Sequence, residues 1–455
     1  MSSWHLRDAR TGRSSSETLG AGPSRPPVAD QTADAIQAPP PPLGRLLEEV
    51  RVQDLADSAK NLAASAVVKD SVLVSSYNWA SGGGRVQEPT ITVPGRPPRW
   101  TPLSRPIRLP DDNGNYGWGR SVSTRKVYRD QNAAGFPKHP MEPAILATLE
   151  TAPDFLAEHS IDVIACGSTM GNLLRFVKGQ DKMFRMLVQV VDDSVFLIRR
   201  ENSPTELIPD IQGFGHSFPE NYTTWDYDVR GSKSHQRMVS YRFGNLRFLV
   251  RFEGDGYLGQ HPGGDKPVPN RRTENQVGNQ TRSSISVHDL AQSMSGTGVS
   301  VGNEVKGDVI KIQRSGALVN QDLIFDLKTR SCKKRDQLEE MKGAELQRLW
   351  VSRVTKFILA FHNRGLFDDI RIMDVKDEID EWESTNSDAL AKLAALVHRI
   401  IALARAQPDG KIEVCRSEGC VLEIRRQVEG LGDVLSPETR DRWIGSSAGG
   451  ARFGR

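Results

Sequence analysis

Hydrophobic residues recur along the chain with two spacings, one typical of strands and one typical of helices. In residues 323–331, apolar side chains alternate until Asp326 and Lys328 enter the pattern. Successive side chains of a strand point to opposite faces, so Asp326 and Lys328 share one face near the end of a predicted strand. In residues 388–406 the apolar positions instead follow the spacing of one helix face.

The same patterns predict an ordered series of elements. The expected helices cover residues 43–68, 141–159, 335–363 and 388–406. The expected strands lie within residues 71–79, 88–100, 162–167, 184–201, 237–259, 308–316, 322–329, 366–377 and 411–427. This order is typical of an α/β (α+β) fold with a mixed central sheet flanked by helices.

Three segments interrupt the periodic pattern. Residues 1–42 are rich in Pro and Ser and are predicted to form a disordered arm. Residues 260–307 contain mostly Gly, Ser, Asn and Gln, and we interpret them as a disordered insertion. Residues 430–455 are predicted to form a flexible tail. The remainder, 43–429, is expected to form a single α/β domain.

Composition adds few constraints to this picture. Of the 455 residues, 60 are Lys or Arg and 57 are Asp or Glu, a net charge of +3, so any binding of nucleic acid must depend on local patches. The four cysteines lack the spacing of a zinc site or a disulfide framework. No apolar run is long enough for a membrane helix. We therefore expect an intracellular protein, nuclear or cytoplasmic, without a membrane partner.

The strand before the insertion also ends in charged residues. Its two faces are Phe248, Val250 and Phe252 on one side, and Leu249, Arg251, Glu253 and Asp255 on the other. If this strand lies beside residues 322–329, then Glu253, Asp255, Asp326 and Lys328 converge. Carboxylates beside a lysine suit Mg²⁺ or Mn²⁺ and a phosphate substrate. The alternative is a pair of ordinary strand ends that run out into solvent.

The order Glu-x-Asp on one strand and Asp-x-Lys on a later one resembles the PD-(D/E)XK nuclease superfamily. The resemblance extends from about residue 142 to about residue 363 and implies a restriction-endonuclease-like α-β-β-β-α-β core with Mg²⁺-dependent phosphodiester cleavage. It implies that Asp255 and Asp326 are metal ligands, that Glu253 is an added ligand and that Lys328 is the catalytic lysine.

The acidic pair is also similar to that of the decapping and pyrophosphohydrolase exonucleases of this superfamily, which act on RNA 5′ ends. The resemblance favours RNA over DNA as the partner. It also implies an upstream motif from Gly to Glu, which "GFGHSFPE" matches with Gly213 and Glu220. Pro219 departs from the pattern of that motif and puts the role of Glu220 in doubt.

A basic run follows the candidate lysine. Arg330, Lys333, Lys334 and Arg335 are candidates for phosphate contacts, together with Arg251 of the earlier strand. A solvated helix start is the alternative for this run, although cations are disfavoured at a helix N-terminus. Gln347 is interpreted as an exposed helix residue, and His216 and His235 as structural histidines.

A second resemblance covers residues 72–425. The stretches "SSYNW", "EPTITVPGRPP", "DQNAAGFP", "VSYRFGNLRFLVRFEGDGY" and "LWVSRVTKFILAFHNRG" resemble a family of fungal proteins often labelled geranylgeranyl pyrophosphate synthetase. Prenyl synthases use Asp-Asp-x-x-Asp clusters. Here the Asp pairs at 111–112, 192–193 and 368–369 are followed at the third Asp position by Asn115, Phe196 and Ile372. The residues therefore do not support prenyl transfer.

Two hypotheses remain. One is a metal-dependent nuclease or phosphohydrolase that cleaves phosphodiester or 5′-end phosphate bonds of nucleic acid. The other is a non-catalytic interaction protein of the same fold, which binds protein partners through its arm and insertion. The enzyme hypothesis requires that Asp255 and Asp326 can reach one cation with Lys328 beside it.

Overall fold

The protein is described by a computed structural model that covers residues 38–80, 88–112, 127–209, 211–259, 308–417 and 419–448, with the short strands Asn115–Tyr116 and Arg120–Ser121. From Ala38 onward the chain forms one compact unit. The insertion predicted at 260–307 and most of the arm predicted at 1–42 lie outside the described residues. No helix among the described residues has the length and apolar character needed to cross a membrane.

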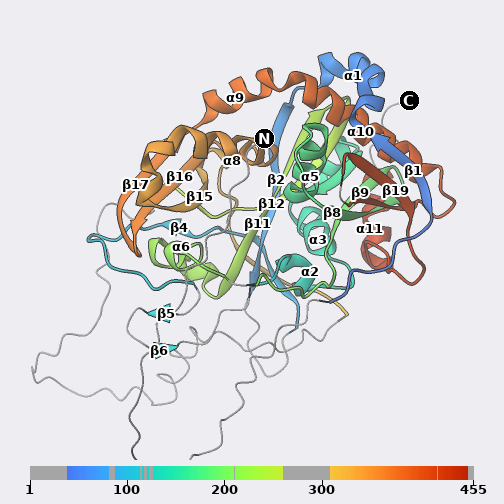
Figure 1. Ribbon diagram of the computed structural model, residues 1–455. Helices are drawn as coiled ribbons and strands as arrows, with labels where there is room; N and C mark the ends of the chain where they lie inside the picture. Colours follow the sequence, from blue (N-terminus) through green and yellow to red (C-terminus); the bar gives the residue numbers. More distant parts are fainter. Residues whose placement is uncertain are drawn as a thin grey trace, which may run out of the picture. The chain divides into compact units, whose positions relative to one another are not determined.

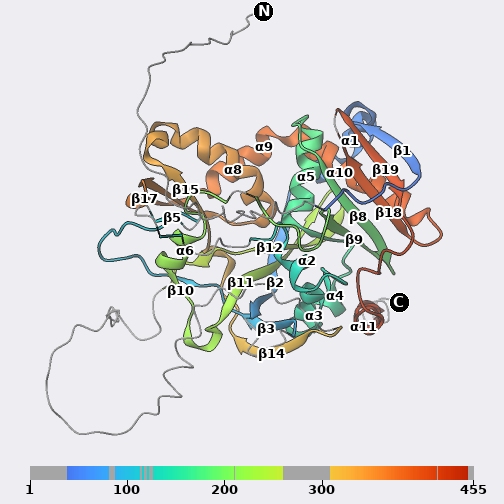
Figure 2. The same ribbon diagram turned by 60° about the horizontal axis from the view of Figure 1, so that its bottom comes forward.

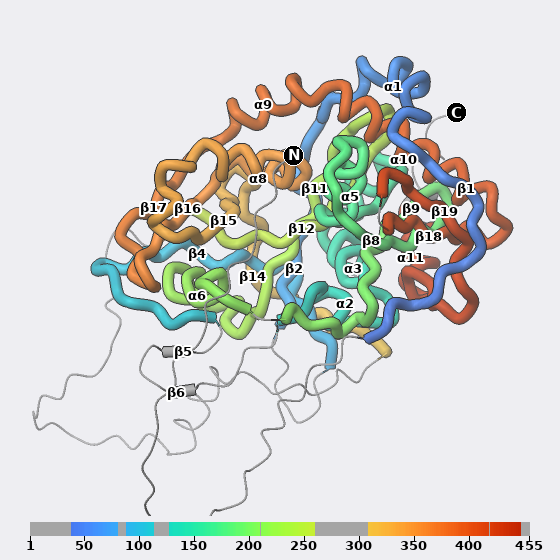
Figure 3. Tube along the Cα trace, viewed as in Figure 1, coloured from blue at the N-terminus to red at the C-terminus, as the bar shows by residue number. Residues whose placement is uncertain are grey.

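The larger of two main sheets is mixed and has the strand order β1-β19-β18-β8-β9-β7-β12-β11-β2-β3-β14. In that order its strands are Leu46–Arg51, Val421–Arg426, Lys411–Arg416, Phe184–Val191, Ser194–Arg200, Val163–Cys166, Leu246–Glu253, Ser232–Phe243, Lys69–Ala80, Thr90–Gly95 and Lys311–Gly316. Figure 1 shows its central strands β2, β11 and β12 side by side. At each end of this sheet, two strands from distant parts of the sequence pair with each other. Figure 2 shows β14 beside β3, and Figure 3 shows the blue β1 beside the red β19.

A smaller sheet has the order β10-β4-β13-β15-β16-β17. Its strands are Thr223–Thr224, Arg99–Trp100, Gly256–Tyr257, Ile324–Ser331, Lys356–Asn363 and Leu366–Asp374. β15 and β16 are parallel, and helix α8 (Leu338–Ser352) connects them. The two sheets meet where β12 of the larger sheet continues into β13 of the smaller one. The short strands β5 (Asn115–Tyr116) and β6 (Arg120–Ser121) pair with each other.

The other helices are α1 (Ala56–Leu62), α2 (Gln131–Gly135), α3 (Glu142–Thr151), α4 (Pro153–Glu158), α5 (Gly167–Val177), α6 (Ser217–Tyr222), α9 (Lys376–Thr385), α10 (Ser387–Arg405) and α11 (Pro437–Ala448). Helices cover both faces of the large sheet, whereas α6 packs in the core of the smaller sheet. Val163 of β7 belongs to the core that contains α5 and α10, whereas the next residue, Ile164, belongs to the core that contains α3 and α11. The predicted mixed sheet flanked by helices is confirmed.

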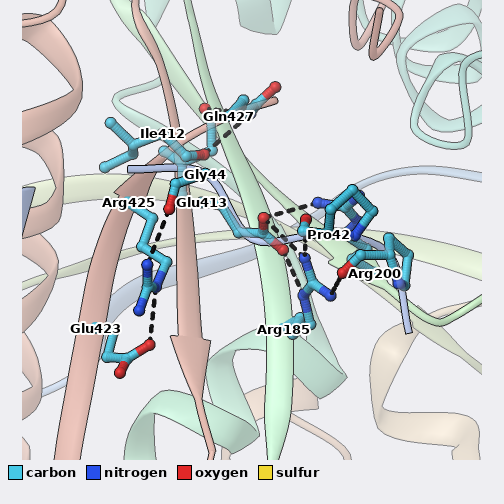
Figure 4. A network of polar contacts seen from close by, with 11 residues as sticks. Pro42, Gly44, Arg185, Arg200, Ile412, Glu413, Glu423, Arg425 and Gln427 are labelled. Carbon is cyan, nitrogen blue, oxygen red and sulfur yellow. Dashed lines mark hydrogen bonds and ion pairs between the residues drawn. The ribbon is translucent and has the colours of Figure 1, made fainter. Parts of the chain in front are cut away.

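Charged residues also form ion pairs between strands of the large sheet. Glu413 of β18 is fully buried, and its carboxylate accepts hydrogen bonds from Arg185 of the adjacent strand β8 and from Arg200 of the next strand, β9 (Figure 4). Arg185 also donates to the carbonyl oxygens of Pro41 and Pro42, at 2.5 and 3.1 Å. These prolines, predicted to end a disordered arm, are therefore bound to the sheet.

Three further predictions about elements were wrong. Residues 43–68 were predicted to form one helix, but they begin with strand β1, because Leu46–Arg51 pairs with β19 almost 400 residues later. The helix predicted at 335–363 ends at Ser352, where Arg353 adopts a left-handed conformation (φ 54°), and β16 follows. The predicted flexible tail contains α11, and its Trp443 is buried against the sheet.

Candidate active site

The junction of the two sheets brings the two acidic strands together. β13 pairs antiparallel with β15, with Gly256 opposite Phe325 and Tyr257 opposite Ile324. Continued by one residue, this register places Asp255 opposite Asp326. One Asp255 oxygen, Oδ2, also accepts a hydrogen bond of 2.7 Å from the backbone N–H of Leu327. The two strand ends predicted to be neighbours are therefore side by side.

Local packing explains why the sequence turns from one sheet to the other here. The motif Glu253-Gly254-Asp255-Gly256 carries a glycine after each carboxylate. A Cβ atom on Gly256 would lie 2.3 Å from the ring of Phe325 and 2.8 Å from the carbonyl oxygen of Pro98. Only glycine fits this close approach of β13 to its neighbours. Gly256 thus fixes the position at which Asp255 meets β15.

Alternate side chains of β12 and β15 point to opposite faces of their strands, as predicted. Phe248, Val250 and Phe252 lie in the core beneath α5 and α10, whereas Leu249 lies in the opposite core. Phe325 and Leu327 of β15 enter a third core with α6. The alternate residues Asp326 and Lys328 line a cavity.

This cavity has a volume of about 920 Å³ and unites residues from both sheets and from α2, α5 and α8. Its described wall contains the carboxylates of Asp130, Glu253, Asp255 and Asp326. It also contains more cations than carboxylates, namely Arg129, Arg175, Lys182, Arg199, Arg251, Lys328, Arg330, Lys334 and Arg348. An excess of positive charge in a concave site favours an anionic ligand.

The carboxylates of the β12–β13 junction are held close to one another. Burial and the negative charges of Asp255 and Asp130 together raise the pKa of Glu253 to about 7, against the opposing charge of Arg251. The Glu253 side chain is exposed at the cavity wall. Burial also raises the pKa of Asp255, against the opposing charges of Arg348 and Lys328 and the hydrogen bond from Leu327. Such a cluster favours a nearby cation.

The sequence suggested a metal ion as the partner of Asp326, but its partner among the described residues is an arginine. Arg348 of α8 donates to both oxygens of Asp326, with 2.5 Å between Nη2 and Oδ1, and the Asp326 side chain is only 8% exposed. Among the described residues, no group of three or more His, Cys, Asp or Glu side chains is placed to hold one metal ion. Glu253, Asp255 and Asp326 are not found as one such group, and Arg348 is the hydrogen-bonded partner of Asp326, so their role as metal ligands stays a prediction.

The pair Asp255 and Asp326 still fits a hard divalent cation. Mg²⁺ and Mn²⁺ are commonly bound by one or two carboxylates, with waters and substrate phosphate as the other ligands. Asp255 lies opposite Asp326, and both carboxylates border the cavity where a phosphate would enter. Lys328 lies on the same face as Asp326 and lowers the pKa of Asp255 by its charge.

The predicted nucleic-acid-binding residues divide into two groups. Arg251, Arg330 and Lys334 line the cavity. Lys333 and Arg335 are not part of that lining, and their role in binding nucleic acid stays a prediction. Arg335 turns to β17, where it pairs with Asp368 at 2.5 Å and Asp369 at 3.1 Å. The basic run forms a short 3₁₀ turn before α8, and the first turn of α8 carries Glu339 and Glu340, as the helix dipole favours.

The upstream motif from Gly to Glu is only partly at the site. Gly213 and Pro219 belong to the cavity wall, whereas Glu220 is not part of that wall. The backbone N–H of Glu220 donates to the carbonyl oxygen of His216 in the first turn of α6. The helix thus presents Pro219 to the cavity, and not the Glu220 that the motif implies.

Two residues interpreted from sequence have clear surroundings. Gln347 is half-buried and lines the cavity, where Nε2 donates to the carbonyl oxygen of Gly171 of α5 at 3.1 Å. The expectation of an exposed helix glutamine was therefore wrong. His235 is buried and contacts Oδ1 of Asn78 through Nδ1 at 2.6 Å, which agrees with a structural histidine.

Several cavity residues were not found from the sequence. Arg175, Lys182 and Arg199 come from α5, the following loop and β9. Burial lowers the pKa of Lys182, and so do the positive charges of Arg175 and Arg199. Gln236 of β11 is buried with its Nε2 donor unpaired. These residues are isolated polar positions within apolar or loop segments, and only the fold shows that they share a cavity.

Solved structures similar to this chain include three fungal Rai1 proteins. The S. pombe Rai1 structure, in complex with 3′-FADP, is 10% identical with a TM-score of 0.49 and covers 84% of this chain and 100% of its own. Rai1 of Scheffersomyces stipitis, in complex with (3′-NADP)⁺ and calcium ion, is 11% identical with a TM-score of 0.49, over 89% and 99% of the two chains. Rai1 of Candida albicans, in complex with pU5-Mn²⁺, is 12% identical with a TM-score of 0.47, over 84% and 96%.

No curated protein sequence matches this chain. One family matches residues 52–415, which include both sheets' central strands and the whole Asp255–Asp326 junction. Its description is "Domain of unknown function (DUF8563)". The match extends over most of the 455 residues, and the chain therefore belongs to the DUF8563 family.

Proposed function

We propose that this protein is a Mg²⁺- or Mn²⁺-dependent nuclease or phosphohydrolase that acts at the end of a nucleic acid strand. One observation carries the proposal. Asp255 directly precedes β13 and accepts a hydrogen bond from Leu327 of β15, the register of these strands continued by one residue sets it opposite Asp326, and Lys328 follows on the same strand, all in the wall of a cavity with excess positive charge. A paired carboxylate site with a lysine is suited to phosphodiester hydrolysis.

The roles of the protein groups follow from their positions. Asp255 and Asp326 would hold the cation, with Glu253 beside them to receive a proton or a bridging water. The cation, when bound, would polarise the phosphate and lower the pKa of the attacking water. Lys328 would orient that water and balance the charge that develops on the phosphate.

The cationic wall would bind the substrate. Arg251, Arg330 and Lys334, with Arg175 and Lys182, offer donors to several phosphates of one strand. A cavity of about 920 Å³ accommodates a few nucleotides of a single strand but not a duplex. We therefore expect a strand end as substrate, and the resemblance to exonucleases of RNA 5′ ends makes RNA the expected class.

A second candidate function is favoured by the ion pair at Asp326. Because Arg348 already neutralises Asp326, the cavity could bind a phosphorylated strand end without metal or cleavage. The protein would then be a non-catalytic interaction protein of the same fold, with residues 1–42 and 260–307 available for protein partners.

Cleavage and binding assays on the same proteins separate these functions. Wild type and Asp326→Asn would be mixed with 5′-phosphorylated single-stranded RNA or DNA, with Mn²⁺ or with EDTA. The enzyme proposal predicts Mn²⁺-dependent cleavage by wild type that is lost in Asp326→Asn, while both bind the strand. Binding by both proteins without cleavage would support the second candidate, and equal cleavage by both would refute the proposed mechanism.

A further inference from the structure

Arg348 makes the most specific contact of any cation in the described part of the cavity. It lies on α8 and donates to both oxygens of Asp326, a geometry in which the planar guanidinium matches the carboxylate. An arginine does not lose its proton at ordinary pH, so it leaves a carboxylate only by moving to another anion or to water. Arg348 thus places a permanent positive charge beside Asp326, a candidate metal ligand.

The charge of Arg348 acts on Asp255 as well as on Asp326. Its charge opposes the rise that burial causes in the pKa of Asp255, and the charge of Asp255 in turn opposes the fall that burial causes in the pKa of Arg348. The guanidinium therefore provides the positive charge that the two facing carboxylates would otherwise receive from a cation.

Arg348 also has a second partner to which it can turn. Its Nε and Nη2 atoms lie 3.0 and 2.9 Å from Oε2 of Glu345, one turn earlier on α8. The Arg348 side chain is 38% exposed toward the cavity, whereas Asp326 is 8% exposed. The arginine can therefore leave Asp326 without entering an apolar region, and a ligand in the cavity can reach it.

We propose that Arg348 is a positioning residue that occupies Asp326 in the free protein and releases it when a phosphate group enters the cavity. The inference rests on the proposed function, since it assigns the order in which that site is completed. Phosphate oxygens accept the same paired hydrogen bonds from a guanidinium as a carboxylate does. Once Arg348 binds the phosphate, Asp326 and Asp255 are both available to a divalent cation.

This arrangement requires that binding of the phosphate ligand raises the affinity for the cation, and that binding of the cation raises the affinity for the phosphate ligand. Coupling between two ligands is reciprocal and typically amounts to about 5- to 150-fold in affinity. The free protein should bind Mn²⁺ weakly because the cation must displace Arg348. The same site would bind Mn²⁺ more tightly with a phosphate ligand present or with Arg348 removed.

Titration of Mn²⁺, followed by the EPR signal of the free ion, tests the inference without any reading of cleavage. Arg348→Gln should bind Mn²⁺ at least about tenfold more tightly than wild type. Arg330→Gln is the matched control, because Arg330 lines the same cavity but pairs with Glu345 and not with a candidate ligand. The control should remain within about twofold of wild type, a change expected from loss of one positive charge alone.

A second measurement uses the wild type and does not depend on the stability of the variant. Removal of Arg348 leaves Asp326 without its partner, so thermal unfolding of Arg348→Gln must be checked. A nucleoside 3′,5′-bisphosphate should tighten Mn²⁺ binding to wild type by at least about tenfold, after subtraction of Mn²⁺ bound by the bisphosphate alone. In a folded Arg348→Gln the same addition should change the affinity far less.

The inference is overturned if the bisphosphate leaves Mn²⁺ binding to wild type unchanged, or if a folded Arg348→Gln binds Mn²⁺ no better than Arg330→Gln does. These outcomes are distinct from failure of the proposed function. If Mn²⁺ binding behaves as predicted but no strand is cleaved, the nuclease proposal fails and the inference stands. If strands are cleaved but Arg348→Gln binds Mn²⁺ as wild type does, only the inference fails.

Discussion

Two regions of this molecule place charged side chains inside the fold, and they differ in how the charges are balanced. In the large sheet, Glu413 is 0% exposed and is shared by Arg185 and Arg200, with Arg185 also bonded to the carbonyl oxygens of Pro41 and Pro42 (Figure 4). Each of these polar groups has a partner within the protein. The cluster links strands β8, β9 and β18.

The cavity at the sheet junction has the opposite character. Cations outnumber carboxylates in its described wall, Glu253 and Asp255 repel each other, and Lys182 lies near Arg175 and Arg199. Like charges held together in this way cost stability, and they are retained where a ligand supplies the missing opposite charge. The comparison teaches that buried charge alone does not mark a site, whereas charge without a matched partner beside an open volume does.

The largest expected effect is the loss of stability when Glu413, the buried carboxylate shared by Arg185 and Arg200, is replaced. Replacement of Glu413 by Gln leaves Arg185 and Arg200 buried without a counter-charge, and should lower the free energy of unfolding by about 3–5 kcal/mol in urea denaturation. The matched control is Glu423→Gln. Glu423 pairs with Arg425 in the same hairpin but is about 21% exposed, so its loss should cost less than about 1 kcal/mol. Similar losses of stability in both variants would contradict the view that the arginines around Glu413 depend on its buried charge.

A smaller effect concerns pH and the buried His235 beneath the site. Burial, assisted by the charge of Arg237, lowers the pKa of His235 well below its usual value. The unfolded chain then binds a proton below about pH 6.5 that the folded chain does not, so stability falls as pH falls. Between pH 7.5 and 5.5, wild type should lose about 1.4 kcal/mol more than His235→Gln. An equal loss in both proteins would show that His235 is protonated in the folded state.

Two adjacent lysines test which charges the cavity uses. Lys334 lines the cavity and Lys333 is exposed outside its wall. Lys334→Gln should weaken binding of a 5′-phosphorylated oligonucleotide several-fold, and the slope of log affinity against log salt should fall by about 1. Lys333→Gln should bind as wild type does. Fluorescence anisotropy at several salt concentrations measures both, and equal effects at the two positions would indicate a diffuse basic surface instead of the cavity.

The smallest expected effect is a gain in stability. Glu253→Gln removes one of the repelling carboxylates and should raise the free energy of unfolding at pH 8 by less than about 1 kcal/mol. Glu201→Gln is the control, because Glu201 pairs with Arg199 at 2.5 Å and its removal should lower stability slightly. A loss of stability in Glu253→Gln comparable to that of Glu413→Gln would remove the contrast between the two regions.

The sequence predicted those features that depend on local periodicity. The alternation in residues 246–253 and 324–331 placed Asp326 and Lys328 on one face, and both line the cavity. Periodicity could not distinguish β16 from a helix, because its continuous apolar run is compatible with either a buried strand or a buried helix. β1 was missed for a different reason, since its conformation depends on pairing with a strand close to the other end of the chain.

The candidate site was predictable only in part. The Glu253–Asp255 and Asp326–Lys328 pairs have a recognisable spacing, but their partners do not. Arg348 lies next to Gln347 on a helix, and nothing in the local pattern indicates that it reaches Asp326. Such contacts arise from the crossing of α8 over β15, and they determine whether a carboxylate is available to a cation.

The most direct test of the central claim is the single-turnover cleavage rate of 5′-phosphorylated RNA in Mn²⁺ by wild type and Asp255→Asn. Asp255 is the better choice because Arg348, whose charge acts on it, keeps Asp326 as its hydrogen-bonded partner when Asp255 is replaced. The account predicts cleavage by wild type and a rate at least about a hundredfold lower in the variant, with RNA binding retained. Equal rates in the two proteins, or no cleavage by wild type that binds RNA, would contradict it.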